Sequence, residues 1–572
     1  MKKVFLYLLT VTILFAFSTS CDNDEPIIEK GTLESATYNA STKSFTLIYS
    51  SGSTEIVDAV IDNSVSPPTA SATLKDGTVI AIKDANTSGE ATITTSKELS
   101  NYRYVNEWIY EEMSIYYLWN DKLPKSPIYS QRPDDFFSSI LNKYNPASNP
   151  NGDRFSWIQE DYVELLKSLS GVSSDEIGFE YVKVRTNKAG TQFYLLVLYP
   201  RQGTDAEAKG IKRGRWVTRI NGQNITPDNF NQLLGGSGSK KLSMADLTLD
   251  TSDNSYKLQS SGDVTIQMHS NYAENPVYMD SVYIIGSQKI GYLVYHFFAR
   301  DKDDDSNEYD KLLMDRLSNM KSEGITDMVL DLRYNSGGAV SSAIALASAL
   351  VKERSTSNIL VTSQYNSIVH NELLKEYGVN YNKDYFIDKI QGTSYPIPTM
   401  NLPRLYVLTS GWTASASEFI INGLNPYMEV ILIGGTTYGK NVGSTSIYEE
   451  NDSNNKWGLQ PIIVRYANSL GFSDFTAGFT PDHEVDEFDP DGLAETGDEL
   501  FLYKYGDTSD PLLGKALSLI TGTTTMTRSA RISTPFRSSQ VDRNISERML
   551  TPHRFDMQDD VRGDAIKELM KK

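Results

Sequence analysis

Cysteine, histidine and positive charge are all scarce in this chain of 572 residues. A single Cys, at position 21, excludes a disulfide framework and every metal site that needs several cysteines. Lys and Arg number 54 against 73 Asp and Glu, and the resulting charge of −19 argues against a nucleic-acid partner or an anionic lipid surface. At roughly 150 residues per domain, the length predicts about three to five domains.

Long apolar runs are also lacking, apart from one at the N-terminus. Residues 4–17 are apolar except for two threonines, follow Lys2-Lys3 and precede a run of small residues. A membrane span needs about 20 apolar residues, so this run is too short for one. Its charged start, apolar centre and small residues are typical of a secretory signal, which we expect at residues 1–20.

The small residues that lead into Cys21 resemble the lipoprotein box of bacteria. This resemblance implies cleavage before Cys21 and attachment of lipid to that residue, and the acidic run 22–25 is similar to the export tag of some surface lipoproteins. We therefore expect a cell-envelope, outer-membrane lipoprotein, facing either the periplasm or the cell surface, that touches the membrane only through its lipid. The alternative is a plain signal peptide followed by an incidental Cys.

Two small units are expected before residue 171. Residues 21–97 hold a linker and short alternating runs that predict a small β module, with a hairpin at Asp76-Gly77. From Asn101, apolar residues recur every three or four positions through Trp119, which predicts an amphipathic helix. Further helices are expected at 134–141 and 160–169, so residues 98–170 form a helical unit.

Residues 171–278 resemble a PDZ domain. A short helical stretch leads into Gly210-Ile211, Gly214 follows, and an alternating strand ends at Asn221-Gly222. A PDZ domain would bind an extended peptide by strand addition. Arg215 stands where PDZ sequences usually carry Asp, and an unrelated β-hairpin with a helix is the alternative interpretation.

Short apolar strands alternate with helices from about 283 to 487, which predicts an α/β core within 279–520. Strands are expected at 290–295, 328–332, 405–408 and 430–433, and helices at 339–351, 418–424 and 512–519. The Thr-, Ser- and Arg-rich tail 521–572 is not expected to fold independently.

Ser415 lies where a strand turns into an apolar helix. Together with Glu418 it forms a capping-box pattern, a common helix start without catalytic meaning. A helix N-terminus also stabilises the oxyanion of acyl transfer, but a serine nucleophile needs a base. The five histidines lack acidic partners at motif spacing, and His296, the best of them, is more typical of a packed strand residue. Lys440, at a glycine turn beside an apolar strand, could be desolvated and act as the base.

A second group of oxyanion donors is expected at Gly337-Gly338. These glycines follow an apolar strand, precede a helix and could expose backbone N–H groups there. A phosphate loop is excluded because no Gly-Lys-Ser/Thr follows. A calcium loop at 301–312 is disfavoured, since its sixth residue is Ser306 and its twelfth is Leu312.

The Asp-Leu-Arg-x-Asn-x-Gly-Gly, Thr-Ala-Ser-Ala-Ser-Glu and Tyr-Gly-Lys motifs together resemble the carboxyl-terminal processing peptidases, or tail-specific proteases. The interval of 25 residues from Ser415 to Lys440 is the one that this family shows. The resemblance covers about residues 98–510. It implies a multidomain α/β protein with a crotonase-like (ββα-spiral) peptidase core, an inserted PDZ-like domain, an N-terminal helical unit and a small N-terminal β module.

The same resemblance implies a Ser–Lys endopeptidase that acts on polypeptides and needs no cofactor or metal. Ser415 would be the nucleophile and Lys440 the general base, with oxyanion donors at the N–H groups of Ala416, Gly337 and Gly338. The PDZ-like domain would present the C-terminal region of the substrate.

Two positions depart from the family pattern. Ser444 stands where members often carry a Gln that orients the lysine, so Ser444 is the candidate for that role. Pro426 stands where many members carry an acidic residue. These departures keep an alternative open, in which the chain is a non-catalytic envelope lipoprotein that binds peptides or proteins.

Overall fold

The computed structural model describes residues 31–169, 172–173, 176–187, 189–252, 255–270, 272–302, 305–488, 500–523 and 541. The predicted signal peptide, Cys21 and nearly all of the predicted tail lie outside these ranges. The chain divides into two compact units, residues 1–102 and 103–572. Within the described residues, no helix combines the length and apolarity that crossing a bilayer requires.

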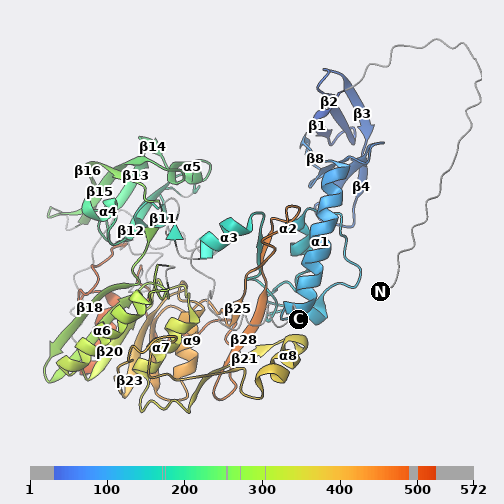
Figure 1. Cartoon of the computed structure of the whole chain (residues 1–572). Helices are drawn as coiled ribbons and strands as arrows, with labels where there is room; N and C mark the ends of the chain where they lie inside the picture. Colours follow the sequence, from blue (N-terminus) through green and yellow to red (C-terminus); the bar gives the residue numbers. More distant parts are fainter. Residues whose placement is uncertain are drawn as a thin grey trace, which may run out of the picture. The chain divides into compact units, whose positions relative to one another are not determined.

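The first unit is the predicted small β module, built from two four-stranded sheets (Figure 1). One sheet has the order β3-β2-β1-β7 and the other β4-β5-β6-β8. Tyr38, Phe45 and Ile80 are fully buried in its core. The hairpin expected at Asp76-Gly77 is confirmed, since it joins two antiparallel strands of the second sheet. The strands are β1 (Leu33–Asn39), β2 (Ser44–Tyr49), β3 (Thr54–Asp58), β4 (Val60–Asp62), β5 (Thr69–Thr73), β6 (Val79–Ile82), β7 (Gly89–Glu90) and β8 (Thr92–Thr94).

Three α-helices follow at the predicted places: α1 (Ser96–Tyr116), α2 (Pro133–Ile140) and α3 (Tyr162–Leu169), with a 3-10 turn, η1 (Asn120–Lys122), after the first. The periodic residues Val105, Ile109 and Met113 of α1 are fully buried, which explains the spacing seen in the sequence. Between α2 and α3, strand β9 (Trp157–Gln159) joins β26 (Ile447–Tyr448) and β27 (Gly458–Gln460) in one sheet. The N-terminal helices are thereby tied to a hairpin about 300 residues later in the chain.

The middle module, residues 176–270, is an antiparallel sheet with two short helices. Its main order is β11-β12-β13-β15-β16, and β14 pairs with β13. The predicted helix, strand and Asn221-Gly222 turn are all present. Arg215 pairs with Asp246. The elements are β11 (Phe179–Arg185), β12 (Phe193–Pro200), α4 (Asp205–Ala208), β13 (Trp216–Ile220), β14 (Gln223–Asn224), α5 (Phe230–Leu234), β15 (Ser239–Asp250) and β16 (Ser255–Gln267). The short strands β10 (Val172–Ser173) and β17 (Tyr272–Ala273) pair with each other beside it.

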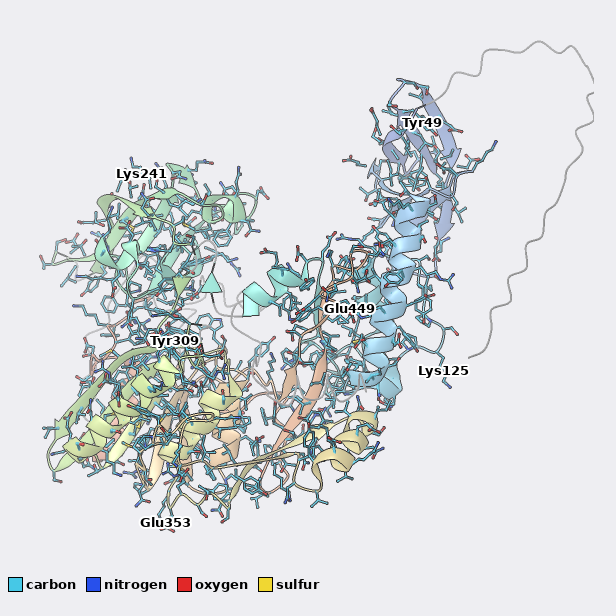
Figure 2. All side chains as sticks on the ribbon, in the orientation of Figure 1. Tyr49, Lys125, Lys241, Tyr309, Glu353 and Glu449 are labelled. Carbon is cyan, nitrogen blue, oxygen red and sulfur yellow. The ribbon has the colours of Figure 1, made fainter. Side chains whose placement is uncertain are left out.

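The α/β core confirms the predicted alternation of strands and helices. Its main sheet has the order β18-β19-β20-β23-β24-β29, parallel except for the first pair. Helices α6, α7 and α9 lie beside this sheet (Figures 1 and 2). Their buried side chains pack in one cluster with the sheet, and those of α10 pack in another. The elements are β18 (Val277–Ile285), β19 (Gln288–Tyr295), α6 (Glu308–Glu323), β20 (Asp327–Asp331), α7 (Val340–Leu350), β23 (Arg404–Thr409), α9 (Ala416–Leu424), β24 (Glu429–Gly434), β29 (His483–Glu484) and α10 (Pro511–Thr521).

A second sheet of the core, in the order β22-β21-β28-β25, continues from the turn that carries Lys440. Its strands are β21 (Ile359–Tyr365), β22 (Lys383–Tyr385), β25 (Val442–Ser444) and β28 (Ile462–Asn468), and α8 (Ser367–Tyr377) follows β21. Because parallel strands β20, β23 and β24 all end at the same edge, the loops after them meet there. These three loops contain Gly337-Gly338, Ser415 and Lys440.

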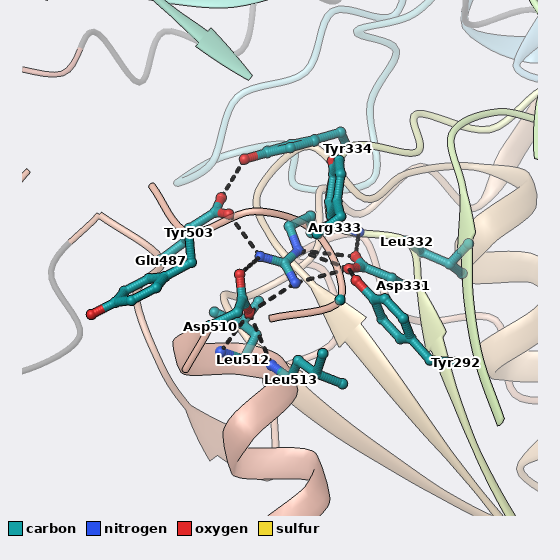
Figure 3. A network of polar contacts seen from close by, with 12 residues as sticks. Tyr292, Asp331, Leu332, Arg333, Tyr334, Glu487, Tyr503, Asp510, Leu512 and Leu513 are labelled. Atoms are coloured by element: carbon teal, nitrogen blue, oxygen red, sulfur yellow. Dashed lines mark hydrogen bonds and ion pairs between the residues drawn. The ribbon is translucent and has the colours of Figure 1, made fainter. Parts of the chain in front are cut away.

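A buried network of charged side chains lies at the end of β20 and the start of the loop that follows it (Figure 3). The Arg333 guanidinium is 1% exposed and pairs with the carboxylates of Asp331, Asp510 and Glu487 at 2.7–2.8 Å. Asp510 also caps α10 by accepting backbone N–H bonds. Glu487 pairs in addition with Arg213 of the middle module. The network therefore joins the main sheet, α10 and the middle module at one guanidinium.

Replacing Arg333 with Met is expected to lower the free energy of unfolding by about 3–5 kcal/mol at neutral pH, because three buried carboxylates would lose their shared cation. Urea unfolding followed by tryptophan fluorescence measures this loss. The matched control is Arg103→Met, which breaks an exposed pair with Glu107 and should cost at most about 0.5 kcal/mol. Equal losses in the two variants would contradict the role given to Arg333.

Acid is expected to weaken the same network. Burial raises the pKa of the Asp510 carboxyl, but the Arg333 guanidinium outweighs burial and lowers this pKa below its usual 3.8. A lowered pKa in the folded state stabilises the protein above the unfolded-state pKa of about 3.9, and this stabilisation is lost as pH falls further. Between about pH 5 and pH 3, the thermal midpoint of Asp510→Asn should therefore fall less than that of the unmodified protein. Equal falls in the thermal midpoints of the two proteins would argue against this role of Asp510.

Candidate active site

Ser415 begins α9 in a strained conformation with its hydroxyl group buried. Its φ of 56° and ψ of −113° lie in a region that residues other than glycine rarely adopt. Half of the predicted capping box is formed, because the Ser415 N–H donates to Glu418 Oε2 at 2.9 Å while the Ser415 side chain makes no cap hydrogen bond. Within the described residues, however, the Ser415 Oγ has no hydrogen-bond partner. The hydroxyl is therefore held at the helix start without being used by the fold.

The Glu418 carboxylate joins the nucleophile loop to the lysine turn. Its Oε2 accepts from the backbone N–H of Ser415 at 2.9 Å and of Lys440 at 2.8 Å. Its Oε1 accepts from the Thr437 hydroxyl at 2.5 Å and the Gly439 N–H at 2.6 Å. Complete burial raises the pKa of Glu418, and these four donors oppose that rise. A single oxygen atom thus fixes both predicted catalytic residues at their backbones.

Lys440 lies in the turn between β24 and β25 and is only 4% exposed. Its Nζ lies 5.3 Å from the centroid of the Phe155 ring, which comes from the N-terminal helical region. Because Ser415 Oγ has no partner, no hydrogen bond joins it to the Lys440 amine in this conformation. A resting enzyme often shows such loose geometry before substrate binds. The structure brings the two residues into one site, and their roles stay a prediction.

The loop after β20 lies against Ser415. A Cβ atom added to Gly337 would lie 2.7 Å from Ser415 Cβ and 3.1 Å from the Ala416 nitrogen, so only glycine fits. Asn335 anchors this loop: its backbone O accepts from Ala414 N and Ser417 Oγ, and its Nδ2 donates to the Tyr295 carbonyl. Asn335 belongs to the Asp-Leu-Arg-x-Asn-x-Gly-Gly motif, and the sequence pattern alone assigns it no role.

Of the predicted oxyanion donors, Gly337 is engaged within its own loop in this conformation, and its role stays a prediction. Its N–H already donates to Asn335 Oδ1 at 2.9 Å. The N–H groups of Gly338 and Ala416 have no acceptor among the described residues, so they are the remaining candidates. Gly338 has a φ of 131°, and a Cβ there would lie 2.0 Å from the Phe298 carbonyl oxygen, which again admits only glycine.

The other predicted residues lie as follows. Ser444 is buried at the end of β25, and its role toward the lysine stays a prediction. Pro426 follows α9. His296 is buried, stacked on Tyr199 with ring centroids 3.7 Å apart, as expected for a packed strand residue. Cys21 lies outside the described residues. Across the described ranges, no cluster of three or more His, Cys, Asp or Glu could hold a metal ion.

Arg154 is a residue of this site that sequence analysis missed. It donates to the carbonyl oxygens of Tyr438 and Gly439, directly before Lys440, although it lies far away in the sequence. No local pattern around residue 154 signals this contact, since it depends on the fold of the N-terminal helices.

Comparison with known proteins agrees with this geometry. Residues 289–485 match peptidase family S41, and residues 104–157 match the peptidase S41 N-terminal domain. The first match covers the parallel strands β20, β23, β24 and β29 and the loops that contain Gly337-Gly338, Ser415 and Lys440. The second covers the segment from α1 to the loop that carries Arg154.

Individual relatives extend the match. A carboxyl-terminal-processing protease of Picosynechococcus is 23% identical over 70% of this chain and 85% of its own length. A protein described as "Probable CtpA-like serine protease" from Staphylococcus aureus is 24% identical over 50% of each chain, so the present chain spans half the length of that relative. The crystal structure of an S41 protease from Bacteroides fragilis shares 27% identity, with a TM-score of 0.58 over 73% of this chain and 97% of the other.

The mixed α/β fold, the three loops that meet at Ser415 and the two family matches lead to the same conclusion. The chain is a serine-type peptidase that carries an S41 peptidase domain at residues 289–485 and an S41 N-terminal domain at residues 104–157, and it is related to the carboxyl-terminal processing proteases.

Proposed function

We propose that this chain is an endopeptidase of the cell envelope that hydrolyses peptide bonds with a Ser415–Lys440 dyad. The observation that carries the proposal is the shared Glu418 oxygen, which holds the backbone of both residues while the Ser415 hydroxyl stays unpartnered. A nucleophile must keep its lone pairs available for the substrate, and a lysine that serves as a base must be shielded from water. Ser415 and Lys440 are 2% and 4% exposed.

In the proposed reaction, neutral Lys440 accepts the hydroxyl proton as Ser415 Oγ attacks the scissile carbonyl carbon. The N–H groups of Ala416 and Gly338 donate to the resulting oxyanion. The tetrahedral intermediate collapses, the C–N bond breaks, and the protonated lysine gives its proton to the leaving amine. Water, deprotonated by the same lysine, then hydrolyses the acyl-enzyme and restores Ser415.

The wider setting is part of the proposal. The core would have the crotonase-like ββα-spiral form, and the middle module would act as a PDZ domain that presents the C-terminal region of the substrate. The antiparallel sheet and the turn at Asn221-Gly222 support this assignment of the module. Lipid on Cys21 would anchor the chain at the outer membrane, and the negative charge supports a polypeptide rather than a nucleic acid as partner.

Ser415→Ala is expected to reduce cleavage of an unfolded protein by at least about 1,000-fold, because the nucleophilic oxygen is removed. Lys440→Met should be comparably damaging. Fragment release followed by electrophoresis and mass spectrometry measures the rate.

Ser417→Ala is the matched control, since Ser417 is equally buried on the same helix but donates to the Asn335 carbonyl. We expect it to lose no more than about tenfold, the effect of one hydrogen bond of about 1 kcal/mol. Retained cleavage in Ser415→Ala, or stoichiometric peptide binding without cleavage by the unmodified protein, would contradict the proposal and favour a binding lipoprotein.

Glu418→Gln is expected to reduce kcat by about 10- to 1,000-fold with a smaller change in KM. Three of the four groups around this carboxylate are backbone N–H donors that cannot accept, so either orientation of the amide places its NH₂ group against at least one of them. Steady-state kinetics on a fluorogenic peptide measures the effect, with circular dichroism as a control for folding. Unchanged kinetics would show that the carboxylate does not fix the dyad.

A further inference from the structure

Arg154 donates hydrogen bonds to the turn that carries Lys440. One terminal nitrogen of its guanidinium, Nη2, donates to the carbonyl oxygens of Tyr438 and Gly439 at 2.9 Å each and of Thr476 at 3.1 Å. Tyr438 and Gly439 immediately precede the lysine, so these bonds hold the backbone from one side while Glu418 holds it from the other. The turn is thus fixed between a cation and an anion.

The charge of Arg154 is surrounded by neutral groups. Its guanidinium carbon lies 5.0, 4.8 and 4.7 Å from the ring centroids of Tyr144, Phe155 and Tyr438. Among the described residues, none of its hydrogen bonds or ion pairs is to a carboxylate. In the part of the chain that the structure describes, its positive charge is therefore not directly paired with a carboxylate.

The Phe155 ring lies close to both the Arg154 guanidinium and the Lys440 amine. The Lys440 Nζ lies 5.3 Å from the centroid of the same Phe155 ring that Arg154 covers at 4.8 Å. Two cationic groups thus share one aromatic ring, and the lysine is almost fully buried there. A positive charge near an amine disfavours its protonated form.

We propose that Arg154 is a positioning residue for Lys440, which holds the lysine turn by its carbonyl groups and places a second positive charge beside the amine. This inference rests on the proposed role of Lys440 as the base. It gives the N-terminal helical region a part in the reaction, at a site where Ser444 stands in the position of the usual lysine-orienting glutamine. An adjacent cation is one of the ways in which a lysine is activated.

Other charged and titratable groups also face this turn. Glu418 of α9 and Asp153 of the N-terminal region are the carboxylates, and Asp153 accepts from the Phe155 N–H. Tyr438 and Tyr144 are the phenols, and burial raises the pKa of Tyr438. Arg465 of β28 pairs in register with Val442. Removing Arg154 would leave these two carboxylates less opposed, and a carboxylate near an amine favours its protonated form.

The test is the pH dependence of kcat/KM, measured on an unfolded polypeptide, and of the rate at which a fluorophosphonate probe labels Ser415. In Arg154→Gln the acidic limb of both profiles should move up by about 1 pH unit, the order expected for one unit charge near the amine. Activity near neutral pH should then fall about tenfold through kcat, and should recover at high pH.

Arg154→Lys keeps the charge, but its side chain is shorter and its ammonium cannot occupy the place of the Nη2 atom that contacts the three carbonyl oxygens. Its acidic limb should stay within about 0.3 pH unit of the unmodified protein, with a few-fold lower kcat at every pH. Arg132→Gln is the matched control: Arg132 lies in the same region and over a ring, that of Trp457, and should give an unchanged profile.

A profile of Arg154→Gln that superimposes on that of the unmodified protein, or that falls equally at every pH, would overturn the proposal. If Arg154→Gln does not fold, Arg154→Lys provides the test. An unchanged kcat in Arg154→Lys would also overturn the proposal. Failure of the proposed function is seen separately, as absence of cleavage by the unmodified protein or as full activity in Lys440→Met.

Discussion

The site depends on one buried carboxylate that accepts hydrogen bonds from two different loops. Taking a carboxylate out of water is costly, and the cost is offset only when several donors surround it. Glu418 meets this condition with three backbone N–H groups and one hydroxyl. Because the donors belong to the helix start and to the lysine turn, the electrostatic requirement of the carboxylate also sets the geometry between Ser415 and Lys440.

Local sequence patterns predicted much of this arrangement. The apolar strand runs end where glycine and small residues begin, so the three loops of the main sheet and the residues in them could be predicted from the sequence alone. The spacing of Val105, Ile109 and Met113 likewise predicted the first helix. In these segments the local structure depends on neighbours within a few positions, so the spacing of apolar and small residues is enough to predict it.

Contacts between distant segments could not be predicted in this way. The engagement of the Gly337 N–H with Asn335 depends on the detailed path of a loop, and the meeting of Arg154 with the Tyr438 carbonyl depends on the packing of two regions far apart in the chain. The convergence of three carboxylates on Arg333 is similar, since Glu487 and Asp510 are distant in sequence from the motif that contains the arginine. A pattern of residues gives no information on such pairings unless the fold is known.

The N-terminal region has a second structural role, because its strand β9 pairs with β27 in the sheet that also contains β26. Without β9, strand β27 would present unpaired backbone N–H and C=O groups along one side. Such an exposed edge is a template for association with another chain. The peptidase core of this protein is therefore not complete without its N-terminal region. The segment that reaches the lysine turn also pairs with the edge of a core sheet, and that edge would otherwise be prone to aggregate.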